Sequence, residues 1–349
     1  FIVPKILEDG TRNAVTCVGI EHKLGIHASP TCVLAYEGAT GYLVGDENDG
    51  MRFMFTMMNN ARLSVGLQGL SIAERAYQDA RAYANERRQG RAAGTPPGEQ
   101  SLIVEHADVR RMLLTMRALI EAMRALVYLN AESTDLARRG STAHQELADL
   151  LTPITKGWCT DSGIEVTSLA IQIHGGMGYI EETGVAQHYR DARIPPIYEG
   201  TNGIQGMDLV GRKLPMRGGA VARELLARMR DGAGPALADA VDAIGEATDW
   251  LLERLATSAD SRSGGRSGLD DALAGSVPYL RMWGIALGGW LLERSAAAAA
   301  EKPAGFDSTF LDGKPVVSRF YAVHLLPQVR GLLPAVTAGS EVLFAVTNP

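Results

Sequence analysis

Apolar side chains recur at every third or fourth position along most of the chain, a spacing that predicts amphipathic helices with one buried face. The first stripe begins near residue 51, and the Gly- and Pro-rich stretch 90–98 ends it. A second and a third stripe follow, and a fourth helix is expected from Gly200 to about Leu214. Long stripes with short connections predict an antiparallel bundle over residues 51–214. The expected core positions are Leu63, Leu67, Leu70, Ala73, Tyr77, Ala80 and Ala84; Val109, Met112, Met116, Leu119, Met123 and Leu126; and Leu147, Leu150, Ile154, Trp158, Val166, Leu169 and Ile173.

The first 50 residues have a different pattern. β-favouring runs at residues 14–18 and 41–44 are flanked by Gly, Asp and Asn, which predicts short strands joined by turns. So few strands do not make an independently stable sheet. The chain also opens directly on an apolar run at Phe1, so we expect it to be a piece of something longer.

After a boundary at residues 215–219, the helical pattern resumes. Apolar stripes predict helices over residues 237–255, 280–291 and 325–344, and stretches 257–268 and 303–314 are expected to be loops. No cluster of reactive side chains is evident in this part. Residues 219–349 are therefore expected to serve packing or assembly.

Composition excludes several classes of protein. The net charge of −6 gives no electrostatic basis for binding nucleic acid. No apolar run approaches the roughly 20 residues of a transmembrane helix, and no signal peptide is evident, so a cytoplasmic protein is expected. Cys17, Cys32 and Cys159 are too far apart for a disulfide framework, and the scattered histidines suggest no metal site.

Three segments depart from simple helical patterning and could carry chemistry. In the first, residues 83–91, basic side chains gather at the expected end of a helix. They either offset the helix dipole or bind a phosphate through Arg87, because arginine suits bidentate phosphate recognition. In the second, residues 172–179, three glycines in four positions form either a tight turn between helices or a backbone that approaches a ligand closely. Its His174 is more simply a packed histidine than a catalyst.

The third segment, residues 193–205, contains Glu199 between an apolar run and a Gly-led turn into a helix. A carboxylate in that position would be partly removed from water, which suits a general base. The alternative is a glutamate placed near a helix start by the helix dipole. The residues alone do not separate the two.

In this order, the motifs Gln-Ile-His-Gly-Gly-Met-Gly-Tyr at 172–179, Arg-Asp-Ala-Arg at 190–193 and Ile-Tyr-Glu-Gly-Thr-Asn-Gly-Ile-Gln at 197–205 resemble the acyl-CoA dehydrogenase family. Residues 219–349 look similar to the extra C-terminal domain of a long bacterial subtype that includes the methylmercaptopropionyl-CoA dehydrogenases. The resemblance implies a mainly α fold. Its expected parts are the end of a middle β-domain (1–50), a helical bundle with the FAD and acyl-CoA site (51–214) and an additional helical domain (219–349).

The resemblance also implies roles for single residues. Glu199 matches the base that removes the α-proton of an acyl-CoA while FAD takes the β-hydride, and Glu199 and Gly200 are expected at the thioester. The positions that match FAD contacts are Arg87, Gln89, His106, Gln172, Gly175, Gly176, Thr201 and Asn202. Some relatives carry the base directly before the arginine of the first long helix, but here Ala61 precedes Arg62.

The partners implied by the resemblance are an acyl-CoA, an electron-transfer flavoprotein and the N-terminal half of the same enzyme. The resemblance further implies a role in fatty acid β-oxidation and so in lipid metabolism. A homo-oligomer built from dimers is also implied, with Arg87 and Gly175–Gly176 serving different FAD molecules across a two-fold interface. Two alternatives stay open: a non-catalytic assembly or CoA-binding subunit, and an acyl-CoA oxidase or related flavin monooxygenase on the same fold.

Overall fold

The computed structural model describes residues 1–257 and 268–346, and the chain divides into two compact units, Phe1–Ala61 and Arg62–Pro349. The expected loop at 257–268 falls almost entirely outside the described residues. The mainly helical fold predicted from the apolar stripes is confirmed. Helix α1 (Gly50–Glu86) begins in the first unit and continues into the second.

The first unit contains a two-stranded antiparallel sheet. Strand β1 (Val15–Ile20) pairs with β2 (Cys32–Tyr36), and a register shift lies between Cys17 and Gly19. The first predicted strand is confirmed, but the prediction of a strand at residues 41–44 is wrong. That segment makes only an isolated bridge from Tyr42 to Ile2, because the turns on both sides leave it no longer partner to pair with.

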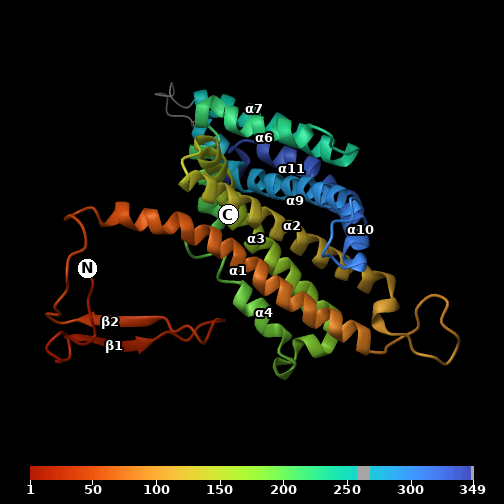
Figure 1. Cartoon of the computed structure of the whole chain (residues 1–349), viewed down its shortest axis with the longest axis horizontal. Coiled ribbons are helices and arrows are strands. Elements are labelled where there is room, and N and C mark those ends of the chain that lie inside the picture. The colour runs from red at the N-terminus through yellow and green to blue at the C-terminus, as the bar shows by residue number, and fades with distance from the viewer. Residues whose placement is uncertain (258–267, 347–349) are drawn as a thin grey trace. The chain divides into compact units, whose positions relative to one another are not determined.

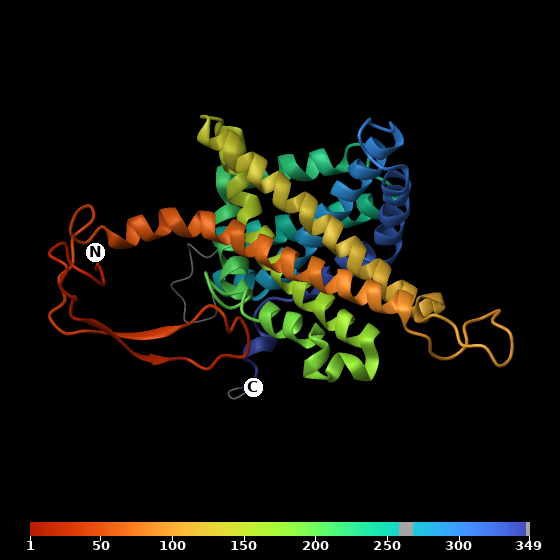
Figure 2. The ribbon, with the colours of Figure 1, turned by 60° about the horizontal axis from the view of Figure 1, so that its bottom comes forward.

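The second unit is a bundle of helices with one hydrophobic core. Helices α2 (Ala107–Arg138), α3 (Thr142–His174) and α9 (Ser276–Ala300) contact one another, and Figures 1 and 2 show them running together. Smaller helices surround them: α4 (Val185–Ala192), α5 (Asn202–Asp208), α6 (Ala220–Arg230), α7 (Pro235–Thr257), α8 (Gly268–Ala274), α10 (Ser308–His324) and α11 (Pro327–Thr337). Short helical turns η1 to η6 lie at Ile103–Glu105, Gly175–Tyr179, Glu181–Thr183, Leu209–Lys213 (a π-helix), Met216–Gly219 and Val342–Phe344.

The core is continuous across the boundary expected at residues 215–219. Met116 and Met123 of α2 belong to the same buried cluster as Tyr279 and Trp283 of α9. Most of the predicted stripe positions are buried, as the Met and Leu stripe of α2 illustrates. The helices before and after residues 215–219 therefore share one hydrophobic core. The expected domain limits at 50, 214 and 219 stay a prediction.

Two expectations about the C-terminal part are wrong. The loop expected through residue 314 ends at Ser308, because the Asp307 side chain accepts a hydrogen bond from the Phe310 N–H (3.1 Å) and caps the start of α10. The helix expected over 325–344 ends at Thr337, two residues before Gly339, which has φ +74°. A glycine at positive φ is a frequent helix terminator.

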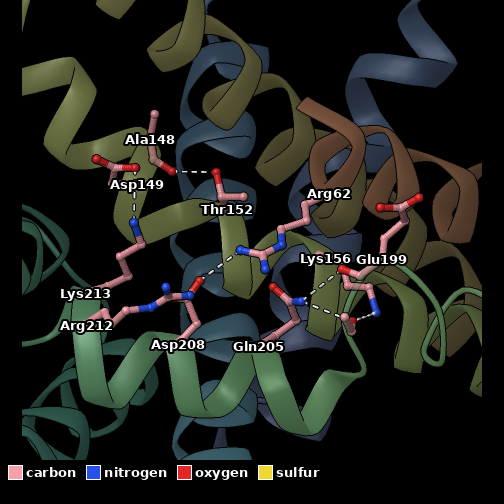
Figure 3. A network of polar contacts seen from close by, with 11 residues as sticks. Arg62, Ala148, Asp149, Thr152, Lys156, Glu199, Gln205, Asp208, Arg212 and Lys213 are labelled. Atoms are coloured by element: carbon pink, nitrogen blue, oxygen red, sulfur yellow. Dashed lines mark hydrogen bonds and ion pairs between the residues drawn. The ribbon is translucent and has the colours of Figure 1, made fainter. Parts of the chain in front are cut away.

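Glycines bring α1 close to α3. A Cβ atom added at Gly66 would lie 2.9 Å from the Thr155 side chain, and one at Gly69 would lie 2.8 Å from the Cys159 carbonyl oxygen. Any larger residue would force the two helices apart. This close approach places Arg62, one turn before Gly66, beside the middle of α3 (Figure 3).

Candidate functional site

Glu199 lies in a strained turn between α4 and α5. Its φ is +53° and that of Gly200 is +81°, so two consecutive residues are left-handed. For a glutamate this conformation is uncommon and costs on the order of 1–3 kcal/mol. Such strain is typical of functional sites when the surroundings hold it in place.

Hydrogen bonds from α3 and α5 hold the turn. The Lys156 ammonium donates to the Gly200 carbonyl oxygen and to the Asn202 Oδ1, each at 2.8 Å. The Gln205 amide donates to the same Gly200 carbonyl at 3.1 Å, with a longer contact to the Glu199 carbonyl at 3.4 Å (Figure 3). Lys156 and Gln205 are both completely buried. The turn therefore rests on fixed polar groups inside the bundle.

The carboxylate of Glu199 stays available. Within the part of the chain that the structure describes, no hydrogen bond or ion pair engages this carboxylate, and the backbone N–H groups of Glu199 and Gly200 donate none. The nearest basic groups are committed elsewhere: Lys156 to the turn, and Arg62 to Asp208 at 3.0 Å. A half-buried, unpaired carboxylate can accept a proton, and free backbone N–H groups in the same turn can polarise a carbonyl.

The two residues after Gly200 form the start of α5. The Thr201 hydroxyl accepts a hydrogen bond from the Ile204 N–H and caps the helix. The Asn202 amide donates to Gly157, Thr160 and Asp161, and its N–H donates to the Pro196 carbonyl. Asn202 thus ties the turn to α3. Its expected contact with a cofactor stays a prediction, and its side chain already has partners on every side.

Sequence reasoning missed Lys156, and it quoted Gln205 only as part of a motif. The available signal for Lys156 was a lone charge in the apolar run from Leu150 to Cys159. A lysine there must be buried, and a buried lysine needs acceptors. Nothing in the sequence alone shows that one acceptor lies 44 residues later in the chain.

Burial lowers the pKa of Lys156 from its ordinary value of 10.5 to about 8; Arg62 acts in the same direction, and Asp161 and Glu199 act against it. The unfolded chain keeps this proton to higher pH than the native protein does. Between the two pKa values the unfolded state therefore binds more protons, and stability rises with pH.

The matching prediction compares the protein with its Lys156→Met variant. From about pH 7 to about pH 9.5, the unfolding free energy of the unaltered protein should rise by about 2 kcal/mol relative to the variant. Urea unfolding at each pH measures the difference. A difference that is constant over this range would mean that Lys156 titrates as an exposed lysine does.

The expected phosphate-binding residues lie at the junction of α1 and α2. The exposed Arg87 follows the last residue of α1, and its guanidinium makes only a 3.5 Å contact with Gln89. His106 immediately precedes α2, and its Nε2 lies 2.8 Å from the Gln89 carbonyl oxygen. The structure therefore brings Arg87, Gln89 and His106 together. Among the described residues Arg87 has no carboxylate partner, so its charge is available to an anion.

The Gly-rich turn after α3 adjoins this junction. The Tyr83 ring stacks on His174 with centroids 4.4 Å apart, which places the end of α1 beside the end of α3. His174 is buried and its Nδ1 contacts the Ala170 carbonyl, in agreement with a packing role. Gln172, Gly175 and Gly176 are exposed, and a Cβ at either glycine would meet nothing within 4 Å. The glycines leave open backbone beside the α1 end.

Two further kinds of feature are absent from residues 1–257 and 268–346. No group of three or more His, Cys, Asp or Glu side chains is placed to share a metal ion. No helix there combines the length and the apolar character that crossing a bilayer requires.

A family model and a sequenced relative both match this chain to acyl-CoA dehydrogenases. The family model "Acyl-CoA dehydrogenase, C-terminal domain" matches residues 48–214, and "Acetyl-CoA dehydrogenase C-terminal like" matches residues 220–347. The 3-methylmercaptopropionyl-CoA dehydrogenase of Ruegeria pomeroyi is 46% identical over 347 residues, which cover 93% of this chain but only 58% of that relative.

Two solved structures share the fold. Caenorhabditis elegans ACDH-11, in complex with C11-CoA, has a TM-score of 0.76 at 20% identity, covering 99% of this chain and 56% of that one. The acyl-CoA dehydrogenase of Bacillus anthracis, complexed with FAD, has a TM-score of 0.70 at 22% identity, covering 96% of this chain and 58% of that one. Because the Ruegeria pomeroyi relative is 46% identical over 93% of this chain, the chain belongs to the acyl-CoA dehydrogenase family.

Proposed function

We propose that this chain takes part in the FAD-dependent α,β-dehydrogenation of an acyl-CoA thioester to a trans-2-enoyl-CoA, with Glu199 as the base. The observation that carries the proposal is the unpaired Glu199 carboxylate on a strained turn fixed by Lys156 and Gln205. Structural strain and fixed surroundings without an internal partner are typical of a residue kept for a ligand.

In this mechanism the chain supplies binding, orientation and proton transfer. The free N–H of Glu199 donates a hydrogen bond to the thioester carbonyl oxygen, which makes the α-proton more acidic. The Glu199 carboxylate then removes that proton. FAD, held by Arg87 and the Gly175–Gly176 turn, would supply the redox chemistry as the acceptor of the β-hydride. An electron-transfer flavoprotein is the proposed electron acceptor.

The residues expected to hold FAD fit an anionic diphosphate and a dinucleotide. Arg87 offers an exposed guanidinium without a carboxylate partner among the described residues, and Gly175–Gly176 offers uncovered backbone. Since the Tyr83–His174 stack places these groups at one junction, we propose that they contact one FAD molecule. This revises the expectation that they serve two different ones. A homo-oligomer built from dimers, in which that FAD comes from a neighbouring subunit, fits the exposure of the junction.

The experiment that tests the function is anaerobic mixing of the FAD-loaded protein with saturated acyl-CoA thioesters. Loss of flavin absorbance, with formation of the 2-enoyl-CoA, is the expected result. A protein that binds acyl-CoA without bleaching would instead be a non-catalytic CoA-binding subunit. Rapid reoxidation by dioxygen, without need for an electron-transfer flavoprotein, would identify an acyl-CoA oxidase.

Replacing Arg87 by Ala is expected to weaken FAD binding by about 10- to 150-fold, because a charge-assisted hydrogen bond contributes roughly 1.5–3 kcal/mol. Retention of FAD on gel filtration and titration of the apoprotein measure the loss. Arg88 is the matched control, since its guanidinium donates to the Gln100 carbonyl oxygen at 2.8 Å. An Arg87→Ala variant that retains FAD as well as the Arg88→Ala variant would place the diphosphate elsewhere.

A further inference from the structure

One buried cation lies directly beneath the Glu199 turn. Lys156 has no exposed surface, although lysine is among the residues least often fully buried. We propose that Lys156 is the positioning residue of the base: by binding the Gly200 carbonyl and Asn202 together, it holds Glu199 in its left-handed conformation. The chemical role of Glu199 in this inference rests on the proposed function.

The first argument is the choice of partners. The Lys156 ammonium spans the Gly200 carbonyl and the Asn202 Oδ1, so one group on α3 fixes the residue after the base and the first residue of α5. Asn202 is itself tied to α3 by bonds from its amide to Gly157, Thr160 and Asp161. The two ends of the turn are therefore fastened to the same helix.

The second argument is that Gln205 alone does not hold the turn. Its Nε2 also donates to the Gly200 carbonyl, but at the longer distance of 3.1 Å, and its buried Oε1 has no hydrogen-bond partner among the described residues. Gln205 also belongs to α5, the helix that the turn begins. Lys156 binds the same Gly200 carbonyl from a different and longer helix, α3.

The third argument is charge. Glu199 lies close enough to attract the Lys156 ammonium, and so does Asp161, while Arg62 repels it. These three groups come from the turn, from α3 and from α1. No ion pair joins the Glu199 carboxylate to Lys156 in the described part of the chain, so this attraction leaves the carboxylate unpaired. A lysine at this place thus fixes the backbone and leaves the base available.

Loss of Lys156 is therefore expected to affect the rate of flavin reduction and not the affinity for acyl-CoA. Without Lys156 the turn is free to relax toward negative φ, which would redirect the carboxylate while leaving the thioester surroundings largely unchanged. A misplacement of about 1 Å can slow a reaction by as much as about 100-fold. A loss of about 10-fold in the rate of flavin reduction, with little change in acyl-CoA affinity, is therefore expected.

The experiment uses the FAD-loaded protein and its Lys156→Met and Lys156→Gln variants. Lys213→Met is the matched control, because Lys213 also bonds to α3, through Asp149 at 3.2 Å, but lies beyond α5 and away from the turn. Two quantities are measured: the rate of flavin reduction against acyl-CoA dissociation, and hydrogen exchange of peptides over residues 194–206. The Asn202 and Gln205 amides, hydrogen-bonded to Pro196 and Thr201, report on the turn in those peptides.

The expected result is slower reduction and faster exchange of residues 194–206 in Lys156→Met, an intermediate effect in Lys156→Gln, whose amide keeps a donor, and neither effect in Lys213→Met. Unchanged exchange and unchanged reduction in Lys156→Gln and Lys156→Met would overturn the proposal. If Lys156→Met does not fold, Lys156→Gln decides by the same two measurements. If the unaltered protein is not reduced by acyl-CoA, the proposed function fails, while hydrogen exchange still decides whether Lys156 holds the turn.

Discussion

Replacing Glu199 by Gln is expected to slow the reduction of bound FAD by acyl-CoA by about 10²- to 10⁴-fold, the usual contribution of a general base. Glutamine keeps the size and shape of the side chain but cannot accept a proton. The backbone N–H of residue 199 is unchanged, so acyl-CoA should still bind. The variant should therefore stay yellow, bind the thioester and fail to bleach in stopped-flow mixing.

Neither of two candidate positions among the described residues can replace the lost base. Ala61, the residue before Arg62, has no group that accepts a proton. The carboxylate of Asp161 accepts a hydrogen bond from Asn202 at 2.7 Å and is thereby committed to the start of α5. The control is Glu182→Gln, which removes an exposed carboxylate on η3 and should leave the rate unchanged. Bleaching of the Glu199→Gln variant at close to the unaltered rate would show that the base is another group.

The sequence predicted the helices well, because the apolar stripes of α1, α2, α3, α7 and α9 are long and regular. It failed where a few polar groups decide the local structure. The Asp307 cap starts α10 inside a stretch that Gly and Pro mark as a loop, and the strand expected at residues 41–44 pairs only through one bridge to Ile2. The single core that joins Met116 to Trp283 depends on contacts between distant segments, which periodicity alone does not show.

The site was predictable to the extent that its residues are adjacent in sequence. Glu199 and its turn stand out because an apolar run meets a Gly-led helix start. The junction of Arg87 with His106 spans a single loop. The groups that fix the turn come from far away: Lys156 lies 44 residues before Gly200, and Arg62 lies 146 residues before Asp208. Sequence spacing contains no information about these pairings, which depend on how α1, α3 and α5 pack against one another.

The buried ion pair behind the turn leads to the second prediction. The Arg62 guanidinium meets Asp208 at 3.0 Å, and the two side chains are 6% and 1% exposed. Arginine keeps its charge at every accessible pH, so removing Asp208 leaves an uncompensated cation in the bundle. The Asp208→Ala variant is therefore expected to lose about 3–5 kcal/mol of unfolding free energy. Urea unfolding at neutral pH measures this loss.

A matched control tests whether the expected loss of unfolding free energy comes from the burial of the ion pair and not from the loss of any ion pair. Asp208 also bonds to Arg212 at 2.6 Å, but the Arg212 side chain is 65% exposed, so Arg212→Ala should cost under about 1 kcal/mol. Replacing both buried partners, with Arg62→Met and Asp208→Leu together, removes the stranded charge and should recover much of the stability lost in Asp208→Ala. Equal losses in Asp208→Ala and Arg212→Ala would contradict a buried pair. The Arg62 guanidinium also lies beside the turn, since a Cβ atom added at Gly200 would be 3.7 Å from the Arg62 Nη2. Without Asp208 to hold Arg62 in place, the turn that contains Glu199 is expected to loosen as well.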